Sequence, residues 1–131
     1  MMTSSNELID SEILARFLYD KQLIRANGTV RHNAFLPPHQ ENCLSVFQVN
    51  GLSENEKWEL GEKYGRKKPL LGRAEIDNFS VNEIGLKSER DVNPPRHVNI
   101  IGWPADKEAR RMKAIEIAQK AKLFLKDIPL C

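Results

Sequence analysis

The pattern of hydrophobic and polar positions predicts a β-strand in three stretches of the chain. Residues 44–49 (LSVFQV) are the clearest strand, because a turn-forming Asn50-Gly51 pair follows them. Residues 70–76 alternate between two sets of side chains, as a strand with two different faces does. Residues 98–101 hold three β-branched side chains, which favour a covered strand. We expect a further short strand at residues 29–32.

Serine and glutamate residues at capping spacing mark the expected helix starts. A serine hydroxyl and a glutamate three positions later can each accept from the other's backbone N–H. One such pair, or Asp10-Ser11 just after it, predicts an N-terminal helix with an apolar face at residues 14–18. A second predicts a helix from Ser53 to about Tyr64, and a third predicts about one helical turn before Gly85. The three pairs are Ser4/Glu7, Ser53/Glu56 and Ser80/Glu83.

The longest helix is expected near the end of the chain, from about Pro104 to Lys126. Pro104 suits the first helical position, and apolar residues then recur at spacings of three and four. Such a helix would extend roughly 34 Å at 1.5 Å per residue. We expect Trp103, which lies between Gly102 and Pro104, to be buried where strand and helix meet. The apolar stripe consists of Ala109, Met112, Ile115, Ala118, Ala121 and Leu125.

Helices and strands alternate irregularly along the chain, so the sequence predicts an α+β fold. We expect a small mixed or antiparallel sheet packed by helices, in a single domain that spans residues 1–131. Residues 87–93 are expected to be a charged, exposed connection. A chain of 131 residues is long enough to bury its own hydrophobic core.

The composition, with 40% hydrophobic and 29% charged residues, is that of an ordinary globular protein. The net charge of +2 is too small to imply a polyanionic partner by itself. No apolar run approaches the length of a membrane span, and the polar residues 1–6 are unlike a signal peptide. Cys43 and Cys131 lie far apart and indicate no metal knot. These features predict a reduced, cytoplasmic protein.

The histidines provide the first candidate chemistry. Arg31-His32 and Arg96-His97 are two Arg-His pairs beside proline pairs, at the ends of expected strands. If the pairs converge, the two imidazoles can exchange a proton near neutral pH and the two guanidiniums can bind phosphate. His32 and His97 are then catalytic candidates for metal-independent cleavage of a phosphodiester, or for recognition of one. The alternative is that each histidine is a surface residue hydrogen-bonded to a loop backbone.

Arg73 is a third candidate phosphate ligand. It alternates with Glu75 and Asp77 on one face of an expected strand, and such a charged face usually points to solvent. In the functional alternative, Arg73 points into a cleft, where Glu75 orients it or acts as a base.

No metal site and no cofactor are predicted. The histidines lack the close spacing of paired ligands such as His-x-His, and the chain has neither a Gly-rich phosphate loop nor a nucleophile elbow. Basic residues cluster at 63–68 and along 110–126, and such clusters can bind the phosphates of a nucleic acid. Acidic residues interrupt the second cluster, as they do on an ordinary solvated helix. Nucleic-acid binding therefore stays an alternative.

Five short motifs stand out: Phe35-Leu36-Pro37-Pro38, Ser45-Val46-Phe47, Gly51-Leu52-Ser53, Gly72-Arg73-Ala74 and Pro94-Pro95-Arg96-His97-Val98-Asn99-Ile100-Ile101-Gly102-Trp103-Pro104. Together they resemble a family of small bacterial proteins, and the last motif is the most specific. The resemblance covers nearly the whole chain, from Ala15 to Leu125. It implies a bacterial source and one intact domain, and it implies no catalytic mechanism.

Two hypotheses of function follow. The first is a cytoplasmic accessory or binding domain of a bacterial protein system that acts through a partner protein, because the domain carries no strong catalytic signature. The second is an RNA- or nucleotide-phosphate-binding enzyme that uses the Arg-His pairs and Arg73. Convergence of those side chains in one cleft would favour the second hypothesis, and a broad uncovered apolar patch would favour the first.

Overall fold

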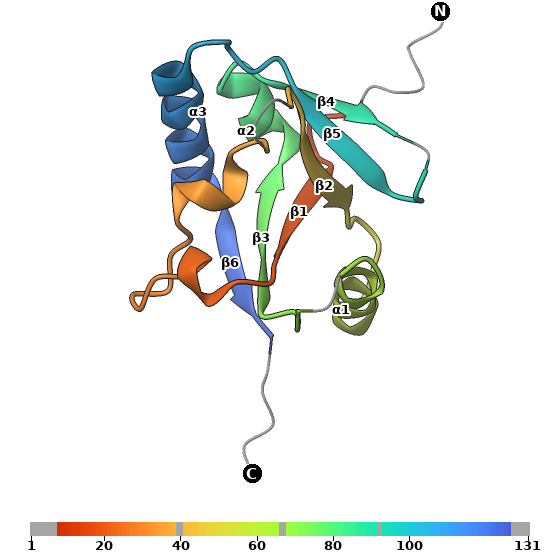
Figure 1. The fold of residues 1–131 in the computed structure, drawn as a ribbon. Helices are drawn as coiled ribbons and strands as arrows, with labels where there is room; N and C mark the ends of the chain where they lie inside the picture. Colours follow the sequence, from red (N-terminus) through yellow and green to blue (C-terminus); the bar gives the residue numbers. More distant parts are fainter. Residues whose placement is uncertain (1–7, 39–40, 66–67, 92, 127–131) are drawn as a thin grey trace, which may run out of the picture.

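The structure is a computed structural model, which describes residues 8–38, 41–65, 68–91 and 93–126. Within these ranges, six strands form one antiparallel sheet in the order β4-β5-β2-β1-β3-β6. Helices pack against the sheet, so the predicted α+β class is confirmed (Figure 1). None of the helices in the described part of the chain is both long and apolar enough to cross a membrane.

The elements follow one another as six strands, three α-helices and two short 3₁₀ helices across the described residues. The strands are β1 (Ile13–Leu18), β2 (Leu44–Gln48), β3 (Gly72–Asp77), β4 (Lys87–Arg90), β5 (His97–Ile101) and β6 (Lys122–Leu125). The α-helices are α1 (Glu54–Lys63), α2 (Asn78–Glu83) and α3 (Lys107–Lys120). The 3₁₀ helices are η1 (Lys21–Leu23) and η2 (His32–Phe35). Strands β2, β3 and β5 fall on the three stretches whose residue pattern predicted a strand.

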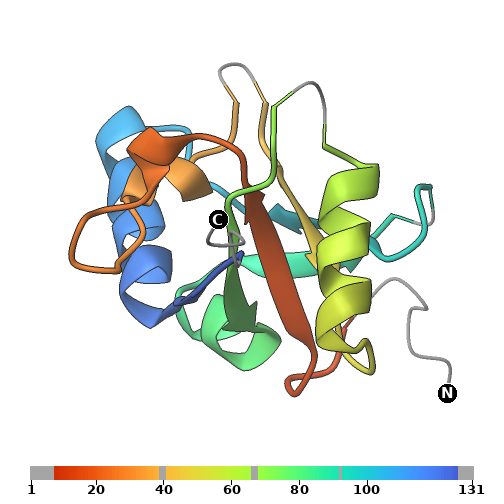
Figure 2. The same cartoon turned by 90° about the horizontal axis from the view of Figure 1, so that it is seen from below.

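The sheet has a separate hydrophobic core on each side. Strand β1 shows the division, because Leu14 and Leu18 join one core while Ala15 and Phe17 join the other. Helix α3 and η2 cover the first core, and α1 covers the second (Figures 1 and 2). We call these two sides of the sheet the α3 face and the α1 face.

The N-terminal helix predicted around residues 14–18 is wrong, because this segment is strand β1. Leu14, Phe17 and Leu18 would share one face of a helix, but β1 lies inside the sheet between β2 and β3. A strand covered on both sides needs apolar side chains in both directions, which removes the simple alternation of a half-exposed strand. Pairing with two neighbours therefore decides the conformation of this segment. The Ser4/Glu7 pair lies outside the described residues.

The last helix is shorter than predicted. Helix α3 begins after Asp106, whose side chain accepts a hydrogen bond from the N–H of Ala109, and it ends at Lys120. Its 14 residues extend about 21 Å. The backbone of Ala121 is extended, and residues 122–125 form β6 and pair with β3. The stretch predicted as one helix is thus a helix followed by an edge strand.

The buried side of α3 also differs from the predicted stripe. Ala114 and Ile117 are completely buried, whereas Met112 is 48% exposed. The core-facing positions are therefore displaced by one residue from Ile115 and Ala118. One residue corresponds to a rotation of about 100° around the helix axis.

The predicted capping box is confirmed for α1 and wrong for α2. At α1, the Ser53 hydroxyl accepts from the N–H of Glu56 and the Glu56 carboxylate accepts from the N–H of Ser53, so this capping box is confirmed. Helix α2 instead begins after Asp77, whose carboxylate accepts from the N–H of Ser80. A carboxylate at the N-cap forms the stronger, charge-assisted bond, so Asp77 and not Ser80 caps this helix.

Three smaller predictions meet different outcomes. Trp103 is 7% exposed and its indole N–H donates to the Ile100 carbonyl oxygen at 2.9 Å, so its burial is confirmed. The connection expected at 87–93 is wrong in part, because it contains β4, an edge strand paired with β5. The strand expected at 29–32 is wrong as well, since only a single bridge between Ile24 and Val30 is formed there.

Candidate functional site

Two motifs that are far apart in the sequence lie side by side in the sheet. Strands β2 and β5 pair so that Ser45 is opposite Asn99 and Phe47 is opposite His97. Directly opposed residues of an antiparallel pair point to the same side. Phe47 belongs to the core of the α1 face, so these four side chains lie on that face.

Ser45, His97 and Asp91 form a continuous hydrogen-bonded arrangement, which we call the relay. The His97 Nε2 atom lies 3.0 Å from the Ser45 hydroxyl, and His97 Nδ1 lies 3.2 Å from the Asp91 carboxylate. An ionised carboxylate only accepts hydrogen bonds, so a neutral His97 carries its proton on Nδ1 and donates it to Asp91. Nε2 is then the acceptor for the Ser45 O–H. This is the arrangement in which a histidine can remove a proton from a serine.

The turn between β4 and β5 brings Asp91 beside His97. The N–H of Asp91 donates to the His97 carbonyl oxygen at 2.9 Å, and the peptide bond between Asn93 and Pro94 is cis. Arg96 has a φ of 69°, in the left-handed region that non-glycine residues rarely adopt.

Arg96 is held by the end of β2. Its Nη1 atom donates to the carbonyl oxygens of Gln48 and Asn50, both at 3.2 Å, and to the Gln48 side chain at 3.0 Å. The Gln48 N–H donates in return to the Arg96 carbonyl oxygen at 2.8 Å. These bonds fix the residue that precedes His97, and they hold its guanidinium at Gln48 and Asn50, at the C-terminal end of β2.

Aromatic rings form one side of the relay. The Phe47 ring meets the His97 ring edge to face at 5.4 Å between centroids, and Tyr64 stacks on Phe47 at 5.1 Å. The His97 side chain is only 12% exposed, whereas Ser45 is exposed on the open part of β2. Packing thus restricts the orientation of the base and leaves the hydroxyl accessible.

The two predicted Arg-His pairs do not converge. His97 lies on the α1 face, whereas His32 lies in η2, which packs against α3 on the other side of the sheet (Figure 2). The two histidines line different pockets, one beside Arg96 and the other beside Arg25. A single site that uses both imidazoles is therefore excluded by their placement.

His32 is surrounded by positive charge. Burial lowers the pKa of its imidazole, and nearby Arg111, Arg25 and Arg31 lower that pKa further. Its pocket has a volume of about 320 Å³, and the lining includes apolar residues of α3 such as Ile115. Among the described residues that line this pocket, two side chains are basic and none is acidic.

The charged strand pattern favoured a solvent-facing Arg73, but the structure does not place Arg73 at the surface. Its side chain is completely buried, and its guanidinium stacks at 4.5 Å on the rings of both Trp58 and Phe124. It donates to the carboxylates of Glu54 and Glu75, each at a shortest distance of 2.6 Å. Burial disfavours its charge, but the bonds to both carboxylates outweigh burial and raise the pKa of Arg73. The arrangement is a structural clamp, separated from His97 by strands β1 and β2.

The basic side chains of residues 110–126, in α3 and just after it, are largely occupied by contacts within the chain. Arg110 donates to the Glu41 carbonyl oxygen, and Lys113 donates to the Ile84 carbonyl oxygen. Three further ion pairs join Arg111 to Glu108, Lys120 to Glu83 and Lys126 to Glu62. These contacts give the basic residues a structural role, and nucleic-acid binding stays a prediction.

Sequence reasoning missed two members of the relay, Ser45 and Asp91. Ser45 belongs to the Ser45-Val46-Phe47 motif, but no local pattern distinguishes it from any other serine at an exposed strand position. Ser45 and His97 are 52 positions apart, so only strand pairing reveals their contact. Within the described ranges, no group of three or more His, Cys, Asp or Glu side chains is placed to hold a metal ion.

Comparison with known proteins finds no matching family model, no matching curated protein and no matching solved structure. The resemblance to a bacterial family therefore stays a prediction, and the function is argued from the geometry of the site.

Proposed function

We propose that this protein is a serine-dependent hydrolase or acyl transferase, with Ser45 as nucleophile, His97 as general base and Asp91 as the residue that orients His97. The single observation that carries the proposal is the relay itself, with contacts of 3.0 Å and 3.2 Å on the two nitrogens of one imidazole. A serine hydroxyl is a weak nucleophile unless an adjacent base removes its proton. A network with a purely structural role would hold β4 and β5 against β2 without reacting.

The chemistry runs in two halves. The Ser45 oxygen attacks the carbonyl carbon of an ester or thioester while its proton passes to His97 Nε2, and Asp91 stabilises the resulting imidazolium. When the tetrahedral intermediate collapses, His97 returns that proton to the departing alcohol or thiol and an acyl-serine remains. Water, or an acceptor alcohol or amine, then attacks the acyl-serine and loses its proton to His97, which restores the hydroxyl of Ser45.

Asn99 is the best-placed side chain to stabilise the negative charge on the carbonyl oxygen. It lies directly opposite Ser45 in the β2–β5 register, and opposed Cβ atoms are roughly 4.5–5.5 Å apart. A side-chain amide N–H at such a position can serve as an oxyanion donor. Because Ser45 is exposed, the fitting substrate is an acyl group carried on a flexible arm that can reach the surface of the sheet.

Covalent labelling tests the proposal directly. The protein is treated with a fluorophosphonate, which reacts with activated serines, and the modified residue is located by mass spectrometry. We expect labelling at Ser45 that is lost in Ser45→Ala and strongly reduced in His97→Gln and Asp91→Asn. Ser11→Ala, at another exposed serine, is the matched control and should leave labelling unchanged.

Hydrolysis of p-nitrophenyl acetate provides the second measurement. Cys43 is a free cysteine two positions from Ser45, so all variants are compared in a Cys43→Ala background to exclude acylation of the thiol. Equal rates for Ser45→Ala and its parent, together with no labelling at Ser45, would assign the relay a structural role only.

The surroundings of His32 favour a second candidate function, which is the binding of a phosphate-bearing small molecule. Arg25 and His32 border the pocket, and Arg31 and Arg111 add positive charge nearby. Within the described chain, no carboxylate forms an ion pair with Arg25 or Arg31, so an anion would supply the missing countercharge. This retains the phosphate hypothesis for His32 and Arg31 and separates it from His97.

Titration of the protein with a nucleoside monophosphate, followed by the NMR signals of the His32 ring, tests this candidate. A shift that is absent in Arg25→Ala would support it, and Lys21→Ala, an exposed residue of η1, is the control. No response at His32 would remove the candidate. The exposed large apolar side chains of the described residues (Ile9, Phe79, Met112 and Leu125) lie on different segments of the chain, so a protein partner stays a prediction. A cytoplasmic location stays a prediction as well.

A further inference from the structure

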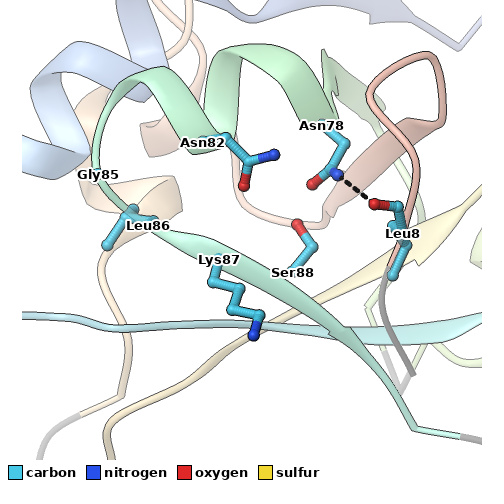
Figure 3. A pocket seen from close by; sticks show the side chains of 7 residues that line it. All are labelled: Leu8, Asn78, Asn82, Gly85, Leu86, Lys87 and Ser88. Atoms are coloured by element: carbon cyan, nitrogen blue, oxygen red, sulfur yellow. Dashed lines mark hydrogen bonds between the residues drawn. The ribbon is translucent and has the colours of Figure 1, made fainter. Parts of the chain in front are cut away.

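A pocket between α2 and β4, separate from both sites above, contains polar atoms that have no hydrogen-bond partner among the described residues. The pocket has a volume of about 390 Å³. Figure 3 shows that side chains from α2 and from β4 meet across it. Its lining residues are Leu8, Asn78, Asn82, Gly85, Leu86, Lys87 and Ser88.

Asn78 and Ser88 are the informative residues. They are only 2% and 3% exposed, yet Asn78 Oδ1 and Ser88 Oγ have no hydrogen-bond partner among the described residues. Buried polar groups are almost always paired, since an unpaired one loses its hydrogen bonds to water without replacement. Two such atoms in one pocket therefore point to partners from outside the described residues.

The orientation of the Asn78 amide is fixed by the chain. Its Nδ2 atom donates to the carbonyl oxygens of Leu8 at 3.0 Å and Ile9 at 3.3 Å. The amide nitrogen is therefore directed toward the segment before β1, and Oδ1 is directed into the pocket (Figure 3). Because a carbonyl oxygen only accepts, the missing partner of Asn78 is an N–H or O–H donor.

Ser88 adds the complementary requirement. Its hydroxyl extends from β4 toward α2 (Figure 3). This hydroxyl can donate a hydrogen bond to an oxygen of a bound molecule, whereas Asn78 Oδ1 can only accept one. At the rim, Asn82 Nδ2 donates to the Asp10 carboxylate at 3.3 Å, which leaves the Asn82 oxygen as a further acceptor. The Lys87 side chain points away from these oxygens, so the centre of the pocket is polar and uncharged (Figure 3).

We propose that this pocket binds a small neutral molecule through an amide edge, in which an N–H donates to Asn78 Oδ1 and the neighbouring C=O accepts from the Ser88 hydroxyl. Lactams, ring carboxamides and nucleobases present this edge. The pocket volume of about 390 Å³ lies at the lower end of the range of small-molecule sites, which suits a single ring rather than a whole dinucleotide.

Two ligands that differ in one donor test the proposal. The protein is titrated with 2-pyridone, which has adjacent N–H and C=O groups, and with N-methyl-2-pyridone, which lacks the donor. Backbone and Asn side-chain NMR signals report binding. We expect 2-pyridone to shift the signals of Asn78 and Ser88, and the N-methyl compound to bind about tenfold more weakly, as loss of one buried hydrogen bond predicts.

A protein variant completes the test. Ser88→Ala removes the unpaired hydroxyl, so it should keep or raise the melting temperature and lose the response to 2-pyridone. Ser80→Ala, in α2 but outside the lining, is the matched control and should retain the response. Equal binding of both ligands would mean that the pocket selects only by shape. No response to either ligand, whatever the melting temperature of Ser88→Ala, would mean that water fills the pocket, and both outcomes overturn the proposal.

Discussion

Arg73 illustrates how one residue can be charged and yet part of the core. Its guanidinium makes planar contacts with two aromatic rings on its faces and hydrogen bonds to two carboxylates at its edge. Arginine suits this place because its flat, weakly hydrated group can stack and form several directed bonds together. Through these contacts, Arg73 connects β3 to α1 and to β6.

Removal of Arg73 should be strongly destabilising. Arg73→Ala leaves the Glu75 carboxylate, whose side chain is 13% exposed, without its closest cation. Removing one partner of a buried ion pair lowers the free energy of unfolding by about 3–5 kcal/mol. Urea unfolding should show this loss, whereas Arg111→Ala, which breaks an exposed pair with Glu108, should change stability by about 0–1 kcal/mol. Similar values for the two variants would contradict the clamp.

His32 gives a prediction about pH. Burial first, and then the charges of Arg111, Arg25 and Arg31, lower its pKa below the ordinary value of 6.5. The unfolded chain therefore binds this proton more readily, so the contribution of His32 to stability is complete above pH 6.5 and is lost as pH falls from 6.5 through the folded pKa.

An NMR titration should place the pKa of His32 below 6.5, and Arg111→Ala should raise it toward that value. Among the three histidines, the ring signals that disappear in His32→Gln are those of His32, and His97→Gln should leave the pKa of His32 unchanged. A pKa of His32 at or above its ordinary value in the parent protein would contradict the cationic environment.

At the scale of elements, α3 and α1 show how packing selects one side of a helix. Helix α3 presents Ala114 and Ile117 to the core of the α3 face, although the periodicity of the sequence also fits the neighbouring stripe. Helix α1 approaches β1 at Gly61, which lies against Phe17. Small residues at such contacts set the distance between a helix and a sheet.

Ile117→Asp and Met112→Asp form a matched pair on α3. Ile117 is completely buried, so its replacement by aspartate places an unpaired charge in the core and should unfold the domain. Met112 is 48% exposed, so the same change there should be tolerated. Thermal melting followed by circular dichroism compares them, and an unfolded Met112→Asp beside a folded Ile117→Asp would reverse the assignment of the helix face.

Gly61→Ala should destabilise the protein although alanine favours helices. Alanine gains about 1 kcal/mol over glycine inside a helix. Its Cβ, however, would lie 2.5 Å from Phe17 Cδ1 and 2.8 Å from Leu70 Cδ2, and overpacking of a core costs about 1–3 kcal/mol. Both contacts belong to buried side chains that cannot move freely, so we expect the melting temperature to fall. Glu59→Ala, on the exposed side of α1, is the control and should not lower it.

At the scale of the whole molecule, the sheet keeps the candidate sites apart. The relay lies on the α1 face, His32 and its pocket lie beside α3, and the amide-edge pocket lies between α2 and β4 (Figure 1). A site in which all the predicted Arg and His residues cooperate would require both sides of the sheet at once. The antiparallel order instead gives His32 and His97 different surroundings.

The sequence by itself determined the features that depend on neighbours along the chain. The pattern of residues 44–49 predicted β2, and the β-branched side chains of residues 98–101 predicted β5. The Ser53/Glu56 pair predicted the start of α1, and the position of Trp103 between Gly102 and Pro104 predicted its burial. Each of these follows from local sterics or from hydrogen bonds within a few residues.

Only the tertiary structure decided which strands pair and which side chains meet. Strands β1 and β6 have no local sequence pattern that distinguishes a strand from a helix. Pairing with β3 decides their conformation, since it supplies the backbone hydrogen bonds that a helix would otherwise form. The clamp of Arg73 joins residues 19 positions apart, and the relay joins Ser45 to His97 across 52 positions. Such contacts depend on the register of distant strands, and no spacing in a single sequence records that register.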